Sequence, residues 1–159
     1  MAYRLASALR AHFDAHRRRT PWAFFWRVWL ETALATAAVG YLLSAIYDDP
    51  SGTEIEDEFR NRPVFFFINS CIVAPLAETL LQSVPVMLAR RFGATFWRQG
   101  LVATIPFAAL HFPAGLSSGL CAGVVGGFYL AFSYAHWREI SLGRAYWMTC
   151  AAHALSNLV

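Results

Sequence analysis

The stretch from Val64 to Ala89 constrains the fold more than any other part of the sequence. It is 26 residues long, and Glu78 is its only charged residue. Because about 20 apolar residues in a helix span the hydrocarbon core of a bilayer, the stretch predicts a membrane-spanning helix. Glu78 then lies near the middle of the bilayer, where a charged group usually faces a bundle interior or a wet cavity. Glu78 is therefore the first candidate functional residue.

The composition of the whole chain agrees with an integral membrane protein. Of its 159 residues, 57% are hydrophobic and 14% are charged, whereas a soluble domain has about 45–50% apolar and about 25% charged residues. All 13 basic residues are Arg, and they cluster at the ends of apolar stretches, so no nucleic-acid partner is expected. The three cysteines, Cys71, Cys121 and Cys150, lie in apolar stretches without metal-binding spacing, which indicates packing residues.

We predict an all-α, polytopic transmembrane helix bundle of about five spans, preceded by a basic N-terminal interfacial helix. Besides 64–89, the expected spans are 24–47, 95–113, 119–136 and 145–159. In the fourth span, Gly119, Gly123 and Gly127 recur every four residues, a pattern that lets helix backbones approach closely. The predicted domains are a basic amphipathic segment, 1–22, and one transmembrane domain, 23–159.

The N-terminal segment shows helical amphipathicity. Leu5, Leu9 and Phe13 have helical spacing and Arg residues around them, which predicts a helix lying on an anionic membrane surface. A solvated basic tail is the alternative. In the first span, Arg27 and Glu31 are four residues apart and are expected to pair on one helix face.

Arg placement predicts the orientation in the membrane. With five spans, the N-terminal Arg cluster and the Arg residues within 90–98 and 138–144 lie on one side, and the acidic loop 48–62 lies on the other. The positive-inside rule then places the N-terminus in the cytoplasm.

Three further polar residues lie at about the predicted depth of Glu78. With a rise of 1.5 Å per residue from the nearest Arg-rich end, Glu78, His111 and Asn157 lie about 18–20 Å deep and His153 about 14 Å. Each residue alone is more simply a hydrogen-bonding or packing group. Together they supply a base for water, a second proton carrier and oxyanion donors, which are the groups that hydrolysis needs. Glu78, His111 and His153 also have the composition of a catalytic zinc site.

Two motifs contain these residues, FxxxH from Phe107 to His111 and HxxxN from His153 to Asn157. With a Glu motif before them, they resemble the motifs of the CAAX prenyl protease and bacteriocin-processing (CPBP) family of intramembrane proteases, the Rce1-like or abortive-infection group. The resemblance covers about residues 64–159. It implies a membrane-embedded endopeptidase domain with this motif core.

The Glu motif departs from the family's EExxxR pattern. Glu78 stands at the first Glu position, Thr79 replaces the second Glu, and Ser83 stands at the Arg position beside Gln82. The helix thus lacks the ion pair that the family pattern implies. Thr79 and Gln82, with Phe107, are the expected supporting residues, and neutral hydrogen bonds are the expected substitute.

The resemblance implies a glutamate-type hydrolysis, although the family was called a metalloprotease in older naming. Glu78, helped by His111, would activate the attacking water, and His153 and Asn157 would stabilise the oxyanion. No cofactor is expected. The alternative is zinc held by Glu78, His111 and His153.

The expected partners are membrane lipids and a membrane-anchored or lipidated peptide or protein substrate. The expected location is the bacterial inner (plasma) membrane. Two other functions stay open at this point. One is a non-catalytic membrane immunity or scaffold protein with the same fold, and the other is a small proton-relay transporter that uses Glu78 and the histidines.

Overall fold

Most of the residues that the computed structural model describes, 2–47 and 51–158, are helical, and no strand occurs in these ranges. Side chains are described for 4–47 and 56–158. The α-helices are α1 (Ala2–Arg17), α2 (Pro21–Ser44), α3 (Ser51–Asn61), α4 (Pro63–Ile68), α5 (Ala74–Arg91), α6 (Phe96–His111), α7 (Gly127–Arg138) and α8 (Leu142–Ser156). The other helical segments are the π-helices η1 (Asn69–Val73) and η3 (Ser118–Gly126) and the 3-10 helix η2 (Phe112–Ala114). The expected all-α class is confirmed.

Two helices of the described part are long and apolar enough to cross a membrane. One runs without a break through α4, η1 and α5, Pro63–Arg91, for 29 residues, and the other joins η3 to α7, Ser118–Arg138, for 21 residues. By contrast, α6 and α8 have 16 and 15 residues, fewer than the roughly 17 that normally span. The expected count of five spans is therefore not confirmed and stays a prediction.

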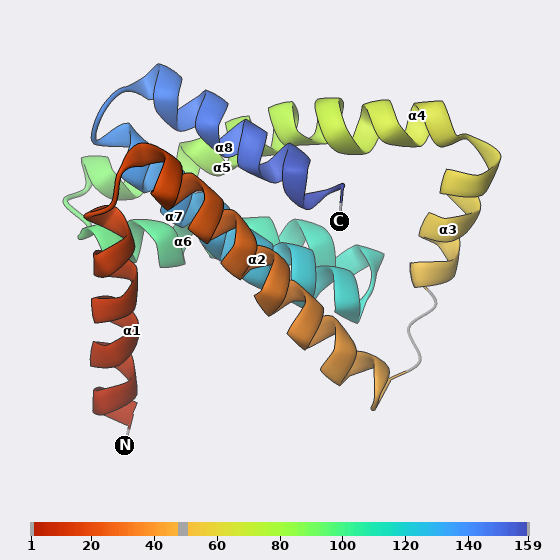
Figure 1. The fold of residues 1–159 in the computed structure, drawn as a ribbon, viewed down its shortest axis with the longest axis horizontal. Helices are drawn as coiled ribbons and strands as arrows, with labels where there is room; N and C mark the ends of the chain where they lie inside the picture. The colour runs from red at the N-terminus through yellow and green to blue at the C-terminus, as the bar shows by residue number, and fades with distance from the viewer. Residues whose placement is uncertain (1, 48–50, 159) are drawn as a thin grey trace.

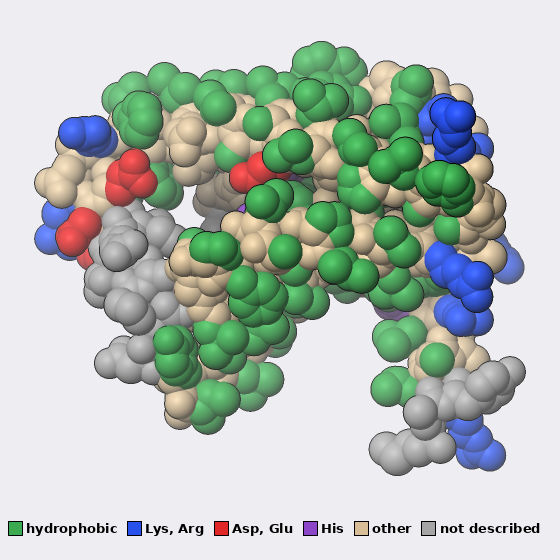
Figure 2. All heavy atoms as spheres, turned by 180° about the vertical axis from the view of Figure 1, so that it is seen from behind, with side chains coloured by type: hydrophobic (Ala, Val, Ile, Leu, Met, Phe, Trp, Pro, Cys, Tyr) green, Lys and Arg blue, Asp and Glu red, His purple; other side chains and the backbone are tan. Residues whose placement is uncertain are grey.

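The surface of the long helix Pro63–Arg91 suits a lipid environment. Large apolar side chains along it are exposed, among them Phe65, Ile72 and Leu81, and apolar patches of this extent are rare on soluble monomers. Figure 2 shows that hydrophobic side chains cover much of the molecule's face in that view, while Arg side chains gather at its two ends. Figure 1 shows α1 and α3 running across the direction of this helix, near its two ends.

The N-terminal helix α1 docks on the bundle through its second half. The Phe13 ring is buried among the rings of Trp97, Phe128 and Phe132, with centroid distances of 5.0–5.3 Å. Arg17 donates two hydrogen bonds to the Glu139 carboxylate, at 2.7 and 2.8 Å. Leu5 and Leu9, in the first half, are exposed. The sequence thus predicted a helix correctly, and its contact with a membrane surface stays a prediction.

Glu31 pairs differently from the expectation. Among the described residues, its ion-pair partners are His12 and His16, with Nε2 atoms 3.0 and 2.9 Å from its carboxylate oxygens. The expected pair with Arg27 is therefore wrong. Helical spacing permits that pair, but the docking of α1 presents two imidazoles to the same carboxylate.

The glycine row of the fourth expected span packs against α6. A Cβ atom on Gly123 would lie 2.8 Å from the Cα atom of Ala108, and one on Gly127 would lie 2.7 Å from the Phe107 ring. Real Cβ atoms do not come this close to other atoms, so the two helices can approach only because these positions lack a side chain. Gly119 likewise faces the ring of Phe112. The close packing predicted from this pattern is confirmed.

Candidate active site

Three helices bring three of the four predicted site residues together. Glu78 comes from the second turn of α5, His111 ends α6, and His153 lies near the end of α8. One carboxylate oxygen of Glu78, Oε2, lies 3.6 Å from Nε2 of His111 and 3.6 Å from Nε2 of His153. The side chain of His153 is 8% exposed and that of Glu78 is 28% exposed. The carboxylate thus stays accessible to a small molecule, while His153 is fixed in the bundle.

The orientation of His111 follows from a hydrogen bond within its own helix. Nδ1 of His111 lies 2.8 Å from the carbonyl oxygen of Phe107. Because a carbonyl can only accept, Nδ1 carries the proton, and the neutral ring then presents the lone pair of Nε2 toward Glu78. The Phe107 ring lies 4.5 Å from the His111 ring and 6.4 Å from the His153 ring. The FxxxH spacing therefore places the Phe107 ring beside the rings of both His111 and His153.

The fourth predicted residue, Asn157, is anchored beside the site. It is the C-terminal cap of α8, one turn after His153, and it is exposed. In the described structure its Nδ2 atom donates a hydrogen bond of 2.7 Å to the carbonyl oxygen of Ser70, in η1, and not to Glu78. Asn157 thus ties the end of α8 to the π-helical turn that precedes α5. The second hydrogen of this amide is left for another acceptor.

Two residues that were not among the predicted site residues hold α8 against α5. The Tyr146 hydroxyl donates to the carbonyl oxygen of Leu76 at 3.1 Å, and the Cys150 thiol donates to that of Pro75 at 3.4 Å. Tyr146 and Cys150 precede His153 by seven and three residues, so they share its helix face. This spacing, counted back from the HxxxN motif, is the signal that could have identified them.

The expected supporting residues on α5 have different roles. Gln82 is buried, and its Nε2 atom donates a bond of 2.8 Å to the carbonyl oxygen of Gly127, which joins α5 to α7. Thr79 is fully buried, and its hydroxyl has no hydrogen-bond partner among the described residues. Ser83 donates to the carbonyl oxygen of Leu80 at 2.7 Å. A neutral hydrogen bond to another helix therefore exists at Gln82 but not at Thr79.

The donor set of Glu78, His111 and His153 fits a zinc ion by type, since a carboxylate and two imidazoles are common zinc ligands. The three donor atoms are less tightly grouped than a second set. Among the described residues, only His12, His16 and Glu31 bring three such atoms within 4.8 Å of one another. The site on α5, α6 and α8 would have to contract to bind a metal through all three residues.

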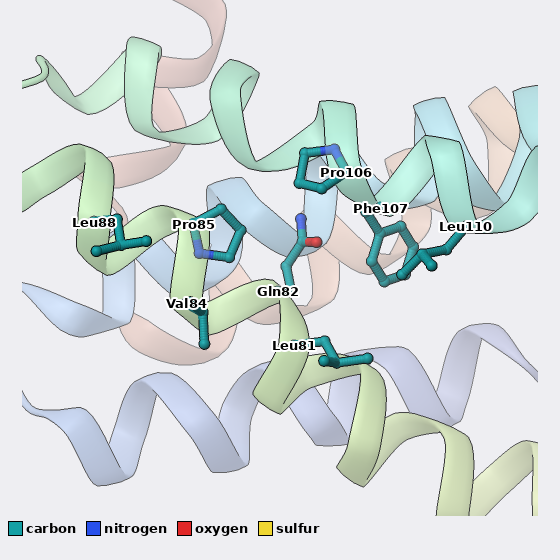
Figure 3. A pocket seen from close by; sticks show the side chains of 8 residues that line it. All are labelled: Leu81, Gln82, Val84, Pro85, Leu88, Pro106, Phe107 and Leu110. Carbon is teal, nitrogen blue, oxygen red and sulfur yellow. The ribbon is translucent and has the colours of Figure 1, made fainter.

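An apolar groove of about 280 Å³ lies between α5 and α6 (Figure 3). Its lining residues are Leu81, Gln82, Val84, Pro85, Leu88, Pro106, Phe107 and Leu110. Gln82 lies one turn from Glu78, and Leu110 precedes His111. One end of the groove therefore adjoins the two site residues on these helices.

The family comparison agrees with this geometry. No curated protein and no solved structure matches the chain. The family model described as Type II CAAX prenyl endopeptidase Rce1-like matches residues 60–159. This range holds Glu78 and both histidines, and the family consists of membrane-embedded proteases. Because the match covers well over half of the sequence, the chain belongs to the Rce1-like family of type II CAAX prenyl endopeptidases.

Proposed function

We propose that the chain is an intramembrane endopeptidase that hydrolyses a peptide bond of a membrane-anchored or lipidated substrate. The observation that carries the proposal is the position of Glu78 Oε2, 3.6 Å from Nε2 of both His111 and His153. These distances exceed the 2.7–3.2 Å of a direct N–H···O hydrogen bond. Polar groups at such a separation are suited to share a bridging water molecule, which is the nucleophile of the proposed reaction.

In the proposed first step, Glu78 accepts a proton from this water while the water oxygen attacks the carbonyl carbon of the substrate. His111 accepts the second hydrogen bond of the water through its Nε2 lone pair, which the bond from Nδ1 to Phe107 makes available. His153, as an Nε2–H donor, and the second N–H of Asn157 stabilise the oxyanion. The protonated Glu78 then gives its proton to the departing amine nitrogen, the C–N bond breaks, and the products are a carboxyl group and an amine.

The groove between α5 and α6 supports a substrate with an apolar segment. Leu81, Val84, Leu88 and Leu110 are exposed at its walls. Gln82 and Phe107 also line the groove (Figure 3), and each is one helical turn from a site residue, Glu78 or His111. An apolar chain lying in this groove would bring a neighbouring peptide bond toward Glu78. The lipid part or the membrane anchor of the substrate is the segment that we assign to the groove.

We further propose a bacterial plasma membrane as the location, with the N-terminus in the cytoplasm. The support for the orientation is that more Arg side chains lie at the end of the molecule that carries α1 than at the other end (Figure 2). At the first of these ends, the Arg-rich α1 docks beside the start of α6 through the contact of Phe13 with Trp97.

The second candidate function is a non-catalytic membrane scaffold or immunity protein. The observation that favours it is the first motif, in which Thr79 occupies the second Glu position and its buried hydroxyl has no partner among the described residues. A protein that has lost this ion pair could keep the fold without catalysing proteolysis.

Terminal proteomics of membrane peptides separates the two functions and tests the proposal. Membranes from cells that make the wild-type chain are compared with membranes from cells that make Glu78→Gln at the same level. The protease predicts peptide ends near a lipidated or membrane-anchored segment that appear only with the wild type. Identical peptide ends in the two samples would favour the scaffold.

We expect Asn157→Ala to retain measurable turnover. The amide is proposed as one of two oxyanion donors, and the loss of one donor costs about 10²–10³ in rate. The change also removes the bond of 2.7 Å to Ser70, so Asn157→Gln is the companion variant: it keeps an amide N–H donor on a side chain one methylene longer. The initial cleavage rate of a membrane peptide in liposomes is the measurement. Wild-type rates for both variants would remove Asn157 from the proposed mechanism.

We expect cleavage to continue after treatment with a metal chelator. The proposed reaction uses Glu78 as the base for an unbound water and needs no Lewis acid. Elemental analysis and cleavage rates are measured before and after chelation, in the wild type and in His12→Gln, because His12 belongs to the second cluster of metal-type donors. Loss of activity on chelation in both proteins, restored by zinc, would assign Glu78, His111 and His153 as zinc ligands.

A further inference from the structure

A second cluster of titratable side chains joins the N-terminal helix to the bundle. His12 and His16 are one turn apart on α1, and Glu31 lies on α2. The Nε2 atoms of His12 and His16 are 3.2 Å apart and lie 3.0 and 2.9 Å from the two Glu31 carboxylate oxygens. The cluster lies on helices other than those that carry Glu78, His111 and His153, and the proposed proteolysis does not use it.

With Glu31 as a carboxylate, no arrangement of protons with both imidazoles neutral satisfies these contacts. If the proton of His12 is on Nδ1, its Nε2 lone pair faces a carboxylate oxygen at 3.0 Å. If both Nε2 atoms carry protons, each can donate to Glu31, but two N–H groups then face each other across 3.2 Å. If the proton of His16 is on Nδ1, that buried atom has no hydrogen-bond partner among the described residues, and the Nε2 lone pair faces a carboxylate oxygen at 2.9 Å. A cation placed among the three groups would remove these conflicts, because all of them would then act as electron-pair donors.

We propose that His12, His16 and Glu31 bind a divalent transition-metal ion, with Zn²⁺ as the best match. Zinc takes imidazole nitrogen and carboxylate oxygen at about 2.0–2.2 Å, so tetrahedral ligand atoms lie about 3.3 Å apart. The two imidazole nitrogens lie 3.2 Å apart, each lies 2.9–3.0 Å from a different Glu31 oxygen, and one ligand atom from each residue lies within 4.8 Å of the others, so small side-chain shifts would bring the three around one ion. Three protein ligands leave a fourth position for water.

The exposure of the ligands suits a site that fills from solution. The side chain of His12 is 51% exposed, so an ion can reach the cluster, while that of His16 is 3% exposed and fixed in position. Burial is the largest influence on His16 and lowers its pKa, despite the opposing effect of Glu31. The neutral form of imidazole, which ligates metals, is the form that burial favours.

Metal binding would fix the turn of α1 that carries His12, which already lies 3.0 Å from Glu31. Phe13, His16 and Arg17 already contact the bundle, whereas Leu5 and Leu9 are exposed. An ion shared by His12 and Glu31 would fix α1 at the boundary between these two halves. The proposed ion is thus a structural link between the Arg-rich N-terminal helix and α2.

The test is a Zn²⁺ titration of the purified full chain in detergent, carrying an affinity tag without histidine, in competition with a chromophoric chelator. We expect the wild type to bind one Zn²⁺ per chain and to give the visible spectrum of a tetrahedral site with Co²⁺. Since loss of an outer partner already weakens metal sites 10–100-fold, loss of a ligand in His12→Gln or Glu31→Gln should weaken binding more than about 100-fold. Glu78→Gln is the matched control, because it makes the same change in the other candidate site, and it should bind like the wild type.

Hydrogen exchange provides a readout that does not depend on stoichiometry. Zn²⁺ should slow exchange of backbone amides in α1 in the wild type and in Glu78→Gln, but not in His12→Gln. His12 is largely exposed, so its replacement should leave the fold intact even if Glu31→Gln does not fold. Equal Zn²⁺ affinity of wild type and His12→Gln, or loss of binding in Glu78→Gln, would overturn the proposal.

Discussion

Replacing Glu78 with Gln should reduce peptide cleavage by about 10²–10⁴-fold, the usual contribution of a general base. The amide keeps the size of the side chain but cannot take the proton from water. It should not destabilise the fold, because a neutral group is easier to hold within an apolar helix bundle than a carboxylate. The measurement is the initial cleavage rate of a membrane-anchored peptide in liposomes, with the apparent Tm of both proteins in detergent.

Glu56→Gln is the matched control for this prediction. Glu56 lies on α3, is exposed, and pairs with Arg60 at 2.7 Å on the same helix. The same chemical change there should leave the cleavage rate within about twofold of the wild type, since surface ion pairs contribute little to stability. If Glu78→Gln also cleaves at the wild-type rate, Glu78 is structural and the scaffold becomes the better interpretation of the fold.

Those parts of the site that depend on local sequence could be predicted. The apolar stretch around Glu78 identifies its helix, and the FxxxH spacing places the supporting residue Phe107 one helical turn before His111, where the two rings lie 4.5 Å apart. Counting residues from the Arg-rich ends of the helices placed Glu78 at about the depth of both histidines. In the structure, Oε2 of Glu78 lies 3.6 Å from Nε2 of His111 and of His153. These predictions succeeded because each depends on the regular rise and repeat of one helix.

Contacts that depend on tertiary docking or on irregular helices could not be predicted. The π-helical segment η1 changes the helical register just before α5, and counting with an ideal helix could not place Ser70 beside Asn157. Glu31 has a suitable partner in its own helix, so the sequence favoured Arg27. Only the docking of α1 shows that His12 and His16 pair with the Glu31 carboxylate instead.

Gly123→Ala should both destabilise the protein and lower its rate of peptide cleavage. The added methyl group would lie 2.8 Å from the Cα atom of Ala108 and 3.1 Å from the Cβ atom of His111. The first of these neighbours is backbone, so α6 and η3 have to move apart, and overpacking of this kind costs about 1–3 kcal/mol. The second neighbour belongs to the site, and a shift of about 1 Å in a reacting group can cost 10²-fold in rate.

Gly143→Ala separates this packing effect from a general effect of Gly-to-Ala changes. Gly143 lies in the first turn of α8, and an added Cβ atom there meets no atom within 4 Å. Its replacement should leave the apparent Tm unchanged or raise it slightly, because Ala favours helix over Gly by roughly 0.8–1.0 kcal/mol. Thermal unfolding in detergent and cleavage rates are measured for both variants. If the close approach of η3 to α6 causes the predicted losses, Gly123→Ala lowers the apparent Tm and the cleavage rate while Gly143→Ala lowers neither. A wild-type Tm and cleavage rate for Gly123→Ala would show that the two helices can separate without disturbing His111.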